Sequence, residues 1–304
     1  MFKQIAFPFL LAGIIALSMF QTIQAGEGKV PKGEKISHIH GLAVDPIDHT
    51  MLLIATHHGL LRCRQGEECS LLGNDRSDFM GFSISADGKT FYVSGHDAST
   101  HQNMGLRRST DRGGKWEVMA FGGRVDFHTM TVNPLNPNII YGWYGRLYRS
   151  LDGGKIWDNP EGKGLPPPSE QGPYSPFLNI LTEPKDPNKV FAATDQGLYS
   201  SSDGGKSWSP VKTLPPVPVV SIAIDMSQRN ISYVFVFRKG LMKSLDGMKD
   251  WKVVGNGIPE REVIGIMAID PRNRDTLYAV SFESNVYRSD DGGENFKLII
   301  ETVK

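Results

Sequence analysis

The amino-acid sequence predicts an all-β fold, a six-bladed β-propeller whose blades are four-stranded antiparallel sheets. Three observations support this fold. One octapeptide occurs five times, its copies begin 41 to 51 residues apart, and each copy follows a similar series of short β-rich runs separated by turn residues. Repeats of this length are typical of propeller blades, which bury their apolar faces against one another around an axis. We expect residues 36–304 to form this single domain.

The octapeptide has the pattern Ser-x-Asp-x-Gly-x-x-Trp/Phe, from which the fourth copy departs at Met248, and we place it in the turn between the third and fourth strands of a blade. The Asp side chain accepts hydrogen bonds from N–H groups of its own turn, Gly supplies a positive φ, and the aromatic ring packs between neighbouring sheets. We therefore predict a structural role for these residues. They are Asp111, Trp116, Asp152, Trp157, Asp203, Trp208, Asp246, Trp251, Asp291 and Phe296.

These octapeptides resemble those of the Asp-box (BNR-repeat) β-propellers, which include sialidases, sortilin-type receptors, photosystem assembly factors and exported bacterial proteins labelled glycosyl hydrolases. The resemblance implies the fold, but it does not select one function, since the group spans enzymes, receptors and chaperones. The segments "HIHGLAVDP", "ATHHGL", "DFMGFSISADGKTFYVSGH" and "VDFHTMTVNP" resemble signature segments of the exported bacterial members. This second resemblance implies export and a face that carries histidines.

Six blades follow from the opening strands, which begin near residues 38, 78, 126, 176, 218 and 263. The first blade lacks the octapeptide, and alignment places Cys63 where the other blades have its serine. We expect a Cys63–Cys69 disulfide to clamp the equivalent turn, because paired cysteines in an exported protein usually form a disulfide. The Pro-rich segment 159–176 lacks strand periodicity and is interpreted as a surface loop, although a seventh blade stays an alternative.

Residues 1–25 read as a signal peptide, with one lysine, an apolar run and small residues at Ala25 and Gly26. An uncleaved N-terminal anchor is the alternative. Cleavage would leave a short linker at 26–35 and a chain that is not inserted in a membrane, located in the periplasm or outside the cell. Equal numbers of basic and acidic residues, 33 of each, argue against a nucleic-acid partner. We expect a monomer.

All eight histidines lie between residues 38 and 128, and seven of them are expected on one face of the first three blades. In a β-strand, residues two apart point to the same side, so we expect His38 and His40, or Asp126 and His128, to project together. Imidazole is a common ligand of transition metals, and a neighbouring carboxylate tunes the choice. The candidate metal ligands, for copper or zinc, are His38, His40, His57, His96, His128, Asp78 and Asp126.

Other side chains expected on the same face are candidates for contacting a ligand. They are His58, Asp97, His101, Trp143, Asp195 and Arg238. Trp143, together with Tyr144 and Phe282, would supply aromatic anchors on exposed loops. Met80 is a marginal candidate ligand, since an inner-strand methionine is usually a core residue.

The functional prediction is an exported propeller with a histidine-rich, metal-binding channel mouth, used for ligand binding or for metal-assisted hydrolysis. No organic cofactor is expected. A metal-free propeller that binds a glycan, a small molecule or an exported protein is the alternative. A glycosidase-like enzyme would instead need two channel carboxylates, from among Asp78, Asp97, Asp126, Asp195 and Glu283. A sialidase is disfavoured, because the chain lacks the Phe/Tyr-Arg-x-Pro segment that supplies the first arginine of those enzymes.

Overall fold

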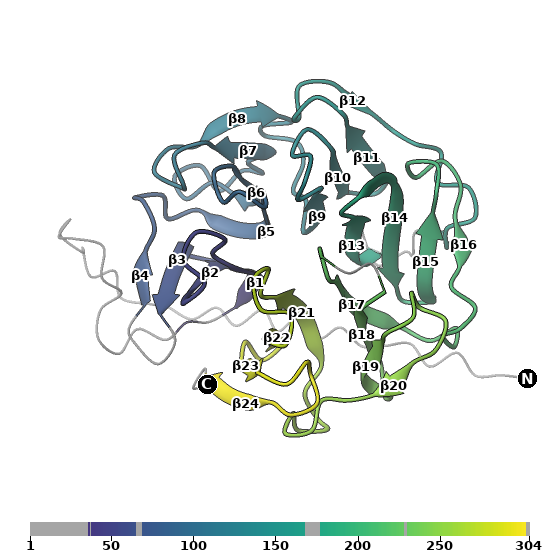
Figure 1. The fold of residues 1–304 in the computed structure, drawn as a ribbon. Helices are drawn as coiled ribbons and strands as arrows, with labels where there is room; N and C mark the ends of the chain where they lie inside the picture. The colour runs from purple at the N-terminus through teal and green to yellow at the C-terminus, as the bar shows by residue number, and fades with distance from the viewer. Residues whose placement is uncertain (1–35, 37, 65–68, 168–176, 228–229, 302–304) are drawn as a thin grey trace, which may run out of the picture.

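The computed structural model describes residues 36, 38–64, 69–167, 177–227 and 230–301. Over these residues the chain forms 24 β-strands and no α-helix. The strands make six four-stranded sheets, each built from consecutive antiparallel strands, which stand around a central axis (Figure 1). The predicted six-bladed β-propeller is therefore confirmed. The predicted signal peptide and linker, residues 1–35, lie outside the described residues, among which no helix has the length and apolarity to cross a membrane.

Each blade has the same order of strands from the axis outward. The innermost strands are β1 (Ile39–Val44), β5 (Asp78–Ile84), β9 (Thr129–Val132), β13 (Phe177–Glu183), β17 (Val219–Ile224) and β21 (Ile264–Ile269). The second strands are β2 (Met51–Thr56), β6 (Phe91–His96), β10 (Ile140–Trp143), β14 (Asp186–Thr194), β18 (Ser232–Val236) and β22 (Leu277–Ser281). The third strands are β3 (Gly59–Arg64), β7 (Leu106–Ser109), β11 (Leu147–Ser150), β15 (Gly197–Ser201), β19 (Gly240–Ser244) and β23 (Val286–Ser289). The outer strands are β4 (Cys69–Leu71), β8 (Glu117–Ala120), β12 (Trp157–Asp158), β16 (Ser209–Pro210), β20 (Lys252–Val253) and β24 (Lys297–Ile300).

The hydrophobic core consists of layers between neighbouring blades. Along β2, alternate side chains point to opposite faces of the sheet, and the four from Leu52 to Ala55 are fully buried. Leu52 and Ile54 pack in a cluster with Tyr278 of the sixth blade, whereas Leu53 packs with Phe91 of the second blade. The apolar run of β2 is uninterrupted because both faces of this strand are buried. The same burial of apolar surface stabilises the contact between adjacent blades.

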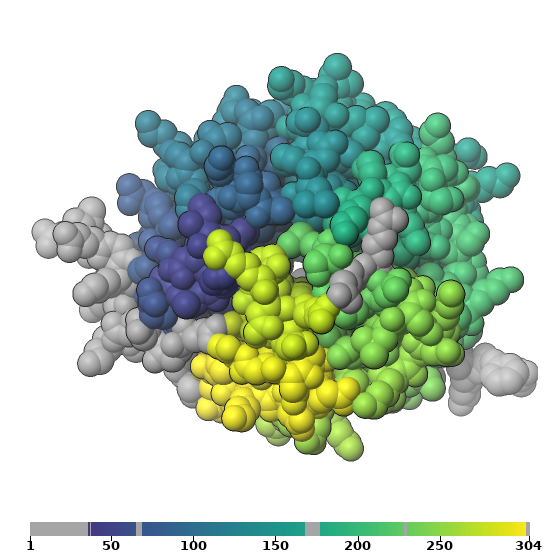
Figure 2. All heavy atoms as spheres, viewed as in Figure 1, coloured from purple at the N-terminus to yellow at the C-terminus, as the bar shows by residue number. Residues whose placement is uncertain are grey.

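The ring closes by packing the first blade against the sixth, without exchange of a strand between the two sheets (Figure 1). The buried backbone N–H of Ile39 donates to the Ser284 hydroxyl over 2.9 Å. At the opposite end of these blades, the Arg272 guanidinium donates to the carbonyl of Pro46 over 3.1 Å. The space-filling view shows the six blades packed around a narrow central opening (Figure 2).

The repeated octapeptides form the hydrogen bonds expected from their sequence. In the third blade the Ser150 hydroxyl accepts from Gly154 N–H over 2.8 Å, and the Asp152 carboxylate accepts from Ile156 N–H over 2.9 Å. The Trp157 indole N–H donates to the carbonyl of Gly154 over 2.9 Å. The serine and aspartate contacts recur in the other four copies, at Ser109 and Asp111, Ser201 and Asp203, Ser244 and Asp246, and Ser289 and Asp291.

The first blade uses a disulfide at the position of the box serine. Cys63 lies opposite Leu52 of the second strand, as Ser150 lies opposite Ile140 in the third blade, and Cys63 is bonded to Cys69. The described part of the Pro-rich segment, residues 159–167, makes no blade strand. Instead the carbonyl of Lys163 accepts from Trp208 N–H over 2.8 Å, so this segment packs on the octapeptide turn of the fourth blade.

Candidate functional site at the channel mouth

The candidate site lies where the innermost strands begin, on the same face as the turns between second and third strands. Two of its histidines come from equivalent turn positions, since His57 follows β2 and His96 ends β6. Asp78 is the first residue of β5, and Asp126 stands at the equivalent position before β9. Because the blades are repeats, equivalent positions of neighbouring blades come side by side at this mouth.

A continuous row of imidazoles and carboxylates crosses the first three blades. His57 Nδ1 lies 2.8 Å from Asp78 Oδ1, and His96 Nδ1 lies 3.3 Å from Asp78 Oδ2. His96 Nε2 lies 3.4 Å from Asp126 Oδ2, and the same oxygen is 2.6 Å from Nε2 of His128. Each turn histidine thus reaches the carboxylate of the next blade, so the row depends on inter-blade contacts.

At the start of the row two imidazoles meet through the atoms that bind metals. His40 Nε2 lies 3.2 Å from His57 Nε2. Ligand atoms of His40, His57 and Asp78 all lie within 4.8 Å of one another. His38 is exposed, and its ring centroid is 4.8 Å from that of His57. Three imidazoles and one carboxylate therefore gather between the first two blades.

The electrostatics of this group favour a neutral imidazole at His40. Burial, followed by the neighbouring His57, lowers the pKa of His40 from 6.5 to about 4, although Asp78 acts in the opposite direction. Burial alone would raise the pKa of Asp78, but the hydrogen bond and charge of His57, with contributions from His40 and His96, hold it below its ordinary value. At neutral pH the group therefore combines a neutral imidazole with an ionised carboxylate.

The other end of the row has a different arrangement. His96 faces a carboxylate with each of its ring nitrogens, and the Asp126 carboxylate is fully buried beneath His96 and His128. Ring nitrogens engaged by carboxylates do not offer a free lone pair to an ion. The structure thus divides the predicted set of metal ligands, with His38, His40, His57 and Asp78 in one group and His96, Asp126 and His128 in another.

His38 and His40 do project together, with ring centroids 6.5 Å apart, and so do Asp126 and His128, but regular strand alternation is not the cause. The pairing of β1 with β2 shifts between Ile39 and Gly41, so His40 is the extra residue of a β-bulge and has no partner on β2. His38 has a positive φ of 55° and precedes the strand. Asp126 and His128 likewise precede β9. A bulge and an irregular entry, not regular strand alternation, direct these side chains toward the mouth.

Trp143 does not serve as an exposed anchor. It is only 5% exposed and stacks on Phe177, with ring centroids 4.2 Å apart. Because both faces of β10 are covered by neighbouring blades, the last residue of this strand still belongs to the core. Phe282 is 63% exposed and does lie on a turn, as expected.

The Asp97 carboxylate is bound to groups of its own blade, mainly in the loop that contains it. Its carboxylate accepts from the N–H groups of Ser99 and Thr100, over 3.0 Å and 3.1 Å, and forms an ion pair with Arg107. The hydroxyl of Ser99 and the guanidinium of Arg107 hold the pKa of Asp97 well below its ordinary value. Asp97 therefore stabilises the loop after β6 and is not the ligand contact that was expected; its Asp-x-Ser sequence is the signal that could have indicated this role.

The remaining predicted contact residues lie on exposed turns outside the row. They are His58, His101, Asp195 and Arg238. Met80 occupies the bulge of β5, equivalent to His40 in β1. Sequence analysis missed the apolar residues at the opposite mouth, among them Met226 and Met267, because no chemistry-bearing side chain marks them; their only signal is their place near the end of each innermost strand.

Known proteins share the fold of this chain at low sequence identity. No family model matches the chain, so membership of the Asp-box family stays a prediction. A probable oligoxyloglucan-reducing end-specific xyloglucanase of Neosartorya fischeri is 24% identical over 222 residues, and the match covers 63% of this chain and 26% of that protein. The chain thus spans about a quarter of the length of this curated relative.

Solved structures likewise share the fold of this chain at low sequence identity. The GH74 xyloglucanase from Xanthomonas campestris superposes with a TM-score of 0.61 at 17% identity, over 87% of this chain and 46% of that one. YCF48 from Cyanidioschyzon merolae superposes with a TM-score of 0.53 at 17% identity, over 91% and 90%. Similarity at this level defines the class of protein, a β-propeller related in fold to glycoside hydrolase propellers, and leaves activity and partner to the site itself.

Proposed function

We propose that this protein is an exported β-propeller that binds a transition-metal ion, zinc or copper, at the channel mouth between its first two blades. His40 and His57 are the ligands, and Asp78 orients His57. The observation that carries the proposal is the 3.2 Å separation of the two Nε2 atoms. Two nitrogens that bind one tetrahedral ion at about 2.0–2.1 Å lie about 3.3 Å apart.

The second support is the hydrogen bond behind His57. A metal-bound histidine usually donates its other ring N–H to a carboxylate, which sets the tautomer and the ring orientation. Asp78 stands at that position, 2.8 Å from His57 Nδ1. With its proton on Nδ1, His57 presents the Nε2 lone pair toward His40. The lowered pKa of His40 keeps this second imidazole neutral and able to coordinate.

His38 is the nearest candidate for a third ligand. It is exposed beside His57, so a modest side-chain rotation changes its distance to the ion. A site with three imidazoles leaves a fourth position for water or for an exogenous ligand, as in zinc sites that act on bound molecules. This open position is where a glycan, a small molecule or a partner peptide would approach.

Hydrolysis by a pair of carboxylates is the weaker candidate, although relatives in fold include proteins named xyloglucanases. Such a mechanism needs a general acid whose pKa is raised. The pKa of Asp78 is lowered, and Asp126 is enclosed by two histidines. Neither of these two carboxylates has the environment of a proton donor. Burial does raise the pKa of Asp195, on the fourth blade, so this carboxylate is the acid that such a mechanism would use.

Export rests on the apolar leader and on the disulfide, which persists in oxidising compartments. Amino-terminal sequencing of protein recovered from the producing cell is expected to begin at Gly26. A mature chain that begins at Met1 would contradict cleavage and favour the N-terminal anchor.

Zinc titration of untagged protein tests the metal site directly. Wild type is expected to bind one equivalent, measured by competition with a chromophoric chelator, while His40→Ala/His57→Ala binds none at the same concentrations. The matched control is His49→Ala/His101→Ala, which removes two histidines outside the row and is expected to retain full stoichiometry. Thermal unfolding in a chelator checks that all three proteins are folded. Equal zinc binding by both double variants would overturn the proposal and leave the metal-free binding propeller as the better account.

A further inference from the structure

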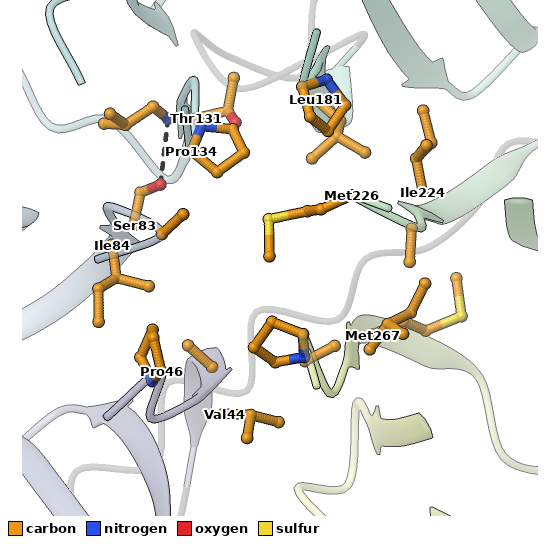
Figure 3. A pocket seen from close by; sticks show the side chains of 18 of the residues that line it. Val44, Pro46, Ser83, Ile84, Thr131, Pro134, Leu181, Ile224, Met226 and Met267 are labelled. Carbon is orange, nitrogen blue, oxygen red and sulfur yellow. Dashed lines mark hydrogen bonds between the residues drawn. The ribbon is translucent and has the colours of Figure 1, made fainter. Parts of the chain in front are cut away.

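The second mouth of the channel differs in chemistry from the histidine face. An apolar cavity of about 210 Å³ lies where the innermost strands end, and all six of these strands contribute to its wall. Figure 3 shows Val44, Ile84, Leu181, Ile224 and Met267 around it, with Met226 reaching toward the centre. Along β1 the lining begins at Leu42, two residues from His40, which corresponds to a rise of roughly 7 Å.

The rim of the cavity repeats in every blade. At the end of each innermost strand a buried polar residue is followed by a residue that lines the cavity, and none of these six lining residues has a polar side chain. They are Pro46, Ala86, Pro134, Pro184, Met226 and Pro271. The repetition shows that the apolar rim belongs to the blade architecture of this chain.

Several polar groups close to the rim accept hydrogen bonds from backbone N–H groups of their own turn or of the neighbouring blade. The Asp225 carboxylate accepts from Ser227 N–H over 2.7 Å, and the Asp270 carboxylate accepts from Arg272 N–H over 2.9 Å. The Ser83 hydroxyl accepts from Val132 N–H over 3.0 Å (Figure 3). These bonds direct several polar atoms toward the backbone, so the wall that remains for an occupant of the channel consists mainly of hydrocarbon and thioether groups, with the hydroxyls of Thr131 and Thr182 as polar exceptions.

We propose that this cavity is a binding site for one small, predominantly apolar molecule with a short alkyl chain. Water in an apolar cavity forms few hydrogen bonds and is displaced favourably by hydrocarbon. The volume is below the range of about 300–1,000 Å³ that holds drug-sized ligands, so the occupant is correspondingly small. The ring of six blades encloses the cavity, so a flat protein surface does not enter it. Methionine side chains adapt to different shapes, which suits Met226 and Met267 to this role.

A series of 1-alkanols tests the proposal, because the hydroxyl stays in the open mouth while the alkyl chain enters. Calorimetric titration of the full chain is expected to give one site. Affinity should rise by about fourfold per methylene from 1-butanol to 1-hexanol, the factor that corresponds to ≈ 0.8 kcal/mol per buried CH₂. The rise should stop once the alkyl chain outgrows the cavity. Wild-type titrations without saturable binding would overturn the proposal.

Paired variants locate the binding. Met226→Asp places a carboxylate in the centre of the cavity and should weaken 1-hexanol binding at least tenfold. Leu135→Asp is the matched control, since Leu135 follows the rim residue Pro134 but points to solvent, with 54% exposure. It should bind like wild type, and circular dichroism should show both variants folded. Equal affinities in wild type and both variants would place the alkanol elsewhere and refute the site. The zinc titration is independent of this outcome.

Discussion

The first three blades and the last three share a backbone at the channel mouth but differ in the side chains placed on it. Five innermost strands shift register at the same point, and the third blade has His128 at the equivalent position. The extra residues are His40, Met80, Leu178, Val220 and Gly265. Only the first three blades carry a histidine or a thioether there. The bulge is therefore a property of the scaffold, and the chemistry is a property of the residue that occupies it.

The first and sixth blades make this contrast directly. In the first blade the bulge residue His40 meets the turn residue His57, with ring centroids 4.5 Å apart. In the sixth blade the equivalent positions hold Gly265 and Phe282, and a Cβ on Gly265 would come within 2.5 Å of the Phe282 ring. One blade places two imidazoles at this pair of positions, and the other places an aromatic ring over a glycine. Changes at the histidine positions should thus alter binding more than folding.

The largest expected effect comes from Asp78. Asp78→Asn replaces the charged carboxylate that accepts from His57 Nδ1–H with a neutral amide and should weaken zinc binding by about 10–100-fold, the usual cost of altering such an orienting group. Asp195→Asn is the control, because Asp195 occupies the turn position of the fourth blade that is equivalent to His57. Competition titrations measure both. If Asp78→Asn and Asp195→Asn bind zinc with the same affinity, Asp78 does not orient His57. The first three blades would then differ from the last three in sequence but not in zinc binding.

The octapeptide turns should behave alike in both halves. Ser109→Ala in the second blade and Ser289→Ala in the sixth each leave a buried N–H, of Gly113 or Gly293, without its acceptor. The expected loss is about 1–3 kcal/mol of unfolding free energy in each case. Urea unfolding provides the measurement, and zinc affinity should stay unchanged. A loss of zinc binding in Ser289→Ala would contradict the separation of scaffold from site.

The disulfide of the first blade should act like an octapeptide turn. Cys63→Ser/Cys69→Ser opens a loop with a sequence separation of 6. Loop-closure entropy for so short a loop corresponds to about 2 kcal/mol of unfolding free energy. Urea unfolding of the oxidised protein and of the variant checks this value. Unchanged stability would show that the bond contributes nothing to the turn that it replaces.

The smallest expected effect is a pH dependence of the metal-free protein. Folding lowers the pKa of His40 from 6.5 to about 4, so the unfolded chain binds the proton more readily between these values. The contribution of His40 to stability is therefore complete above pH 6.5 and is lost as the pH falls toward 4. Relative to His40→Gln, wild type should lose stability over that window and keep a constant difference above it. His101→Gln is the control, and parallel curves for wild type and His40→Gln would contradict the burial of His40.

Much of the scaffold could be predicted because its signals are local. The octapeptide contains both the donors and the acceptors of its turn, so Ser150, Asp152 and Gly154 find one another within a few residues. The disulfide likewise joins two cysteines that are close in sequence. The spacing of the repeats correctly predicted six blades. Alignment of the blades also brought the correct ligand-type residues to one mouth, since equivalent positions of repeats share a place in the fold.

The features that only the tertiary structure determined depend on how neighbouring strands and blades pack against one another. No local pattern encodes the bulge at His40, the reach of His57 to Asp78 of the next blade, or the burial of Trp143 by its neighbours. The same holds for the apolar mouth, whose wall is assembled from six strands far apart in the chain. Short-range spacing determines which groups meet within a turn. The packing angle and register of adjacent sheets determine which groups meet across them, and these emerge only when the ring closes.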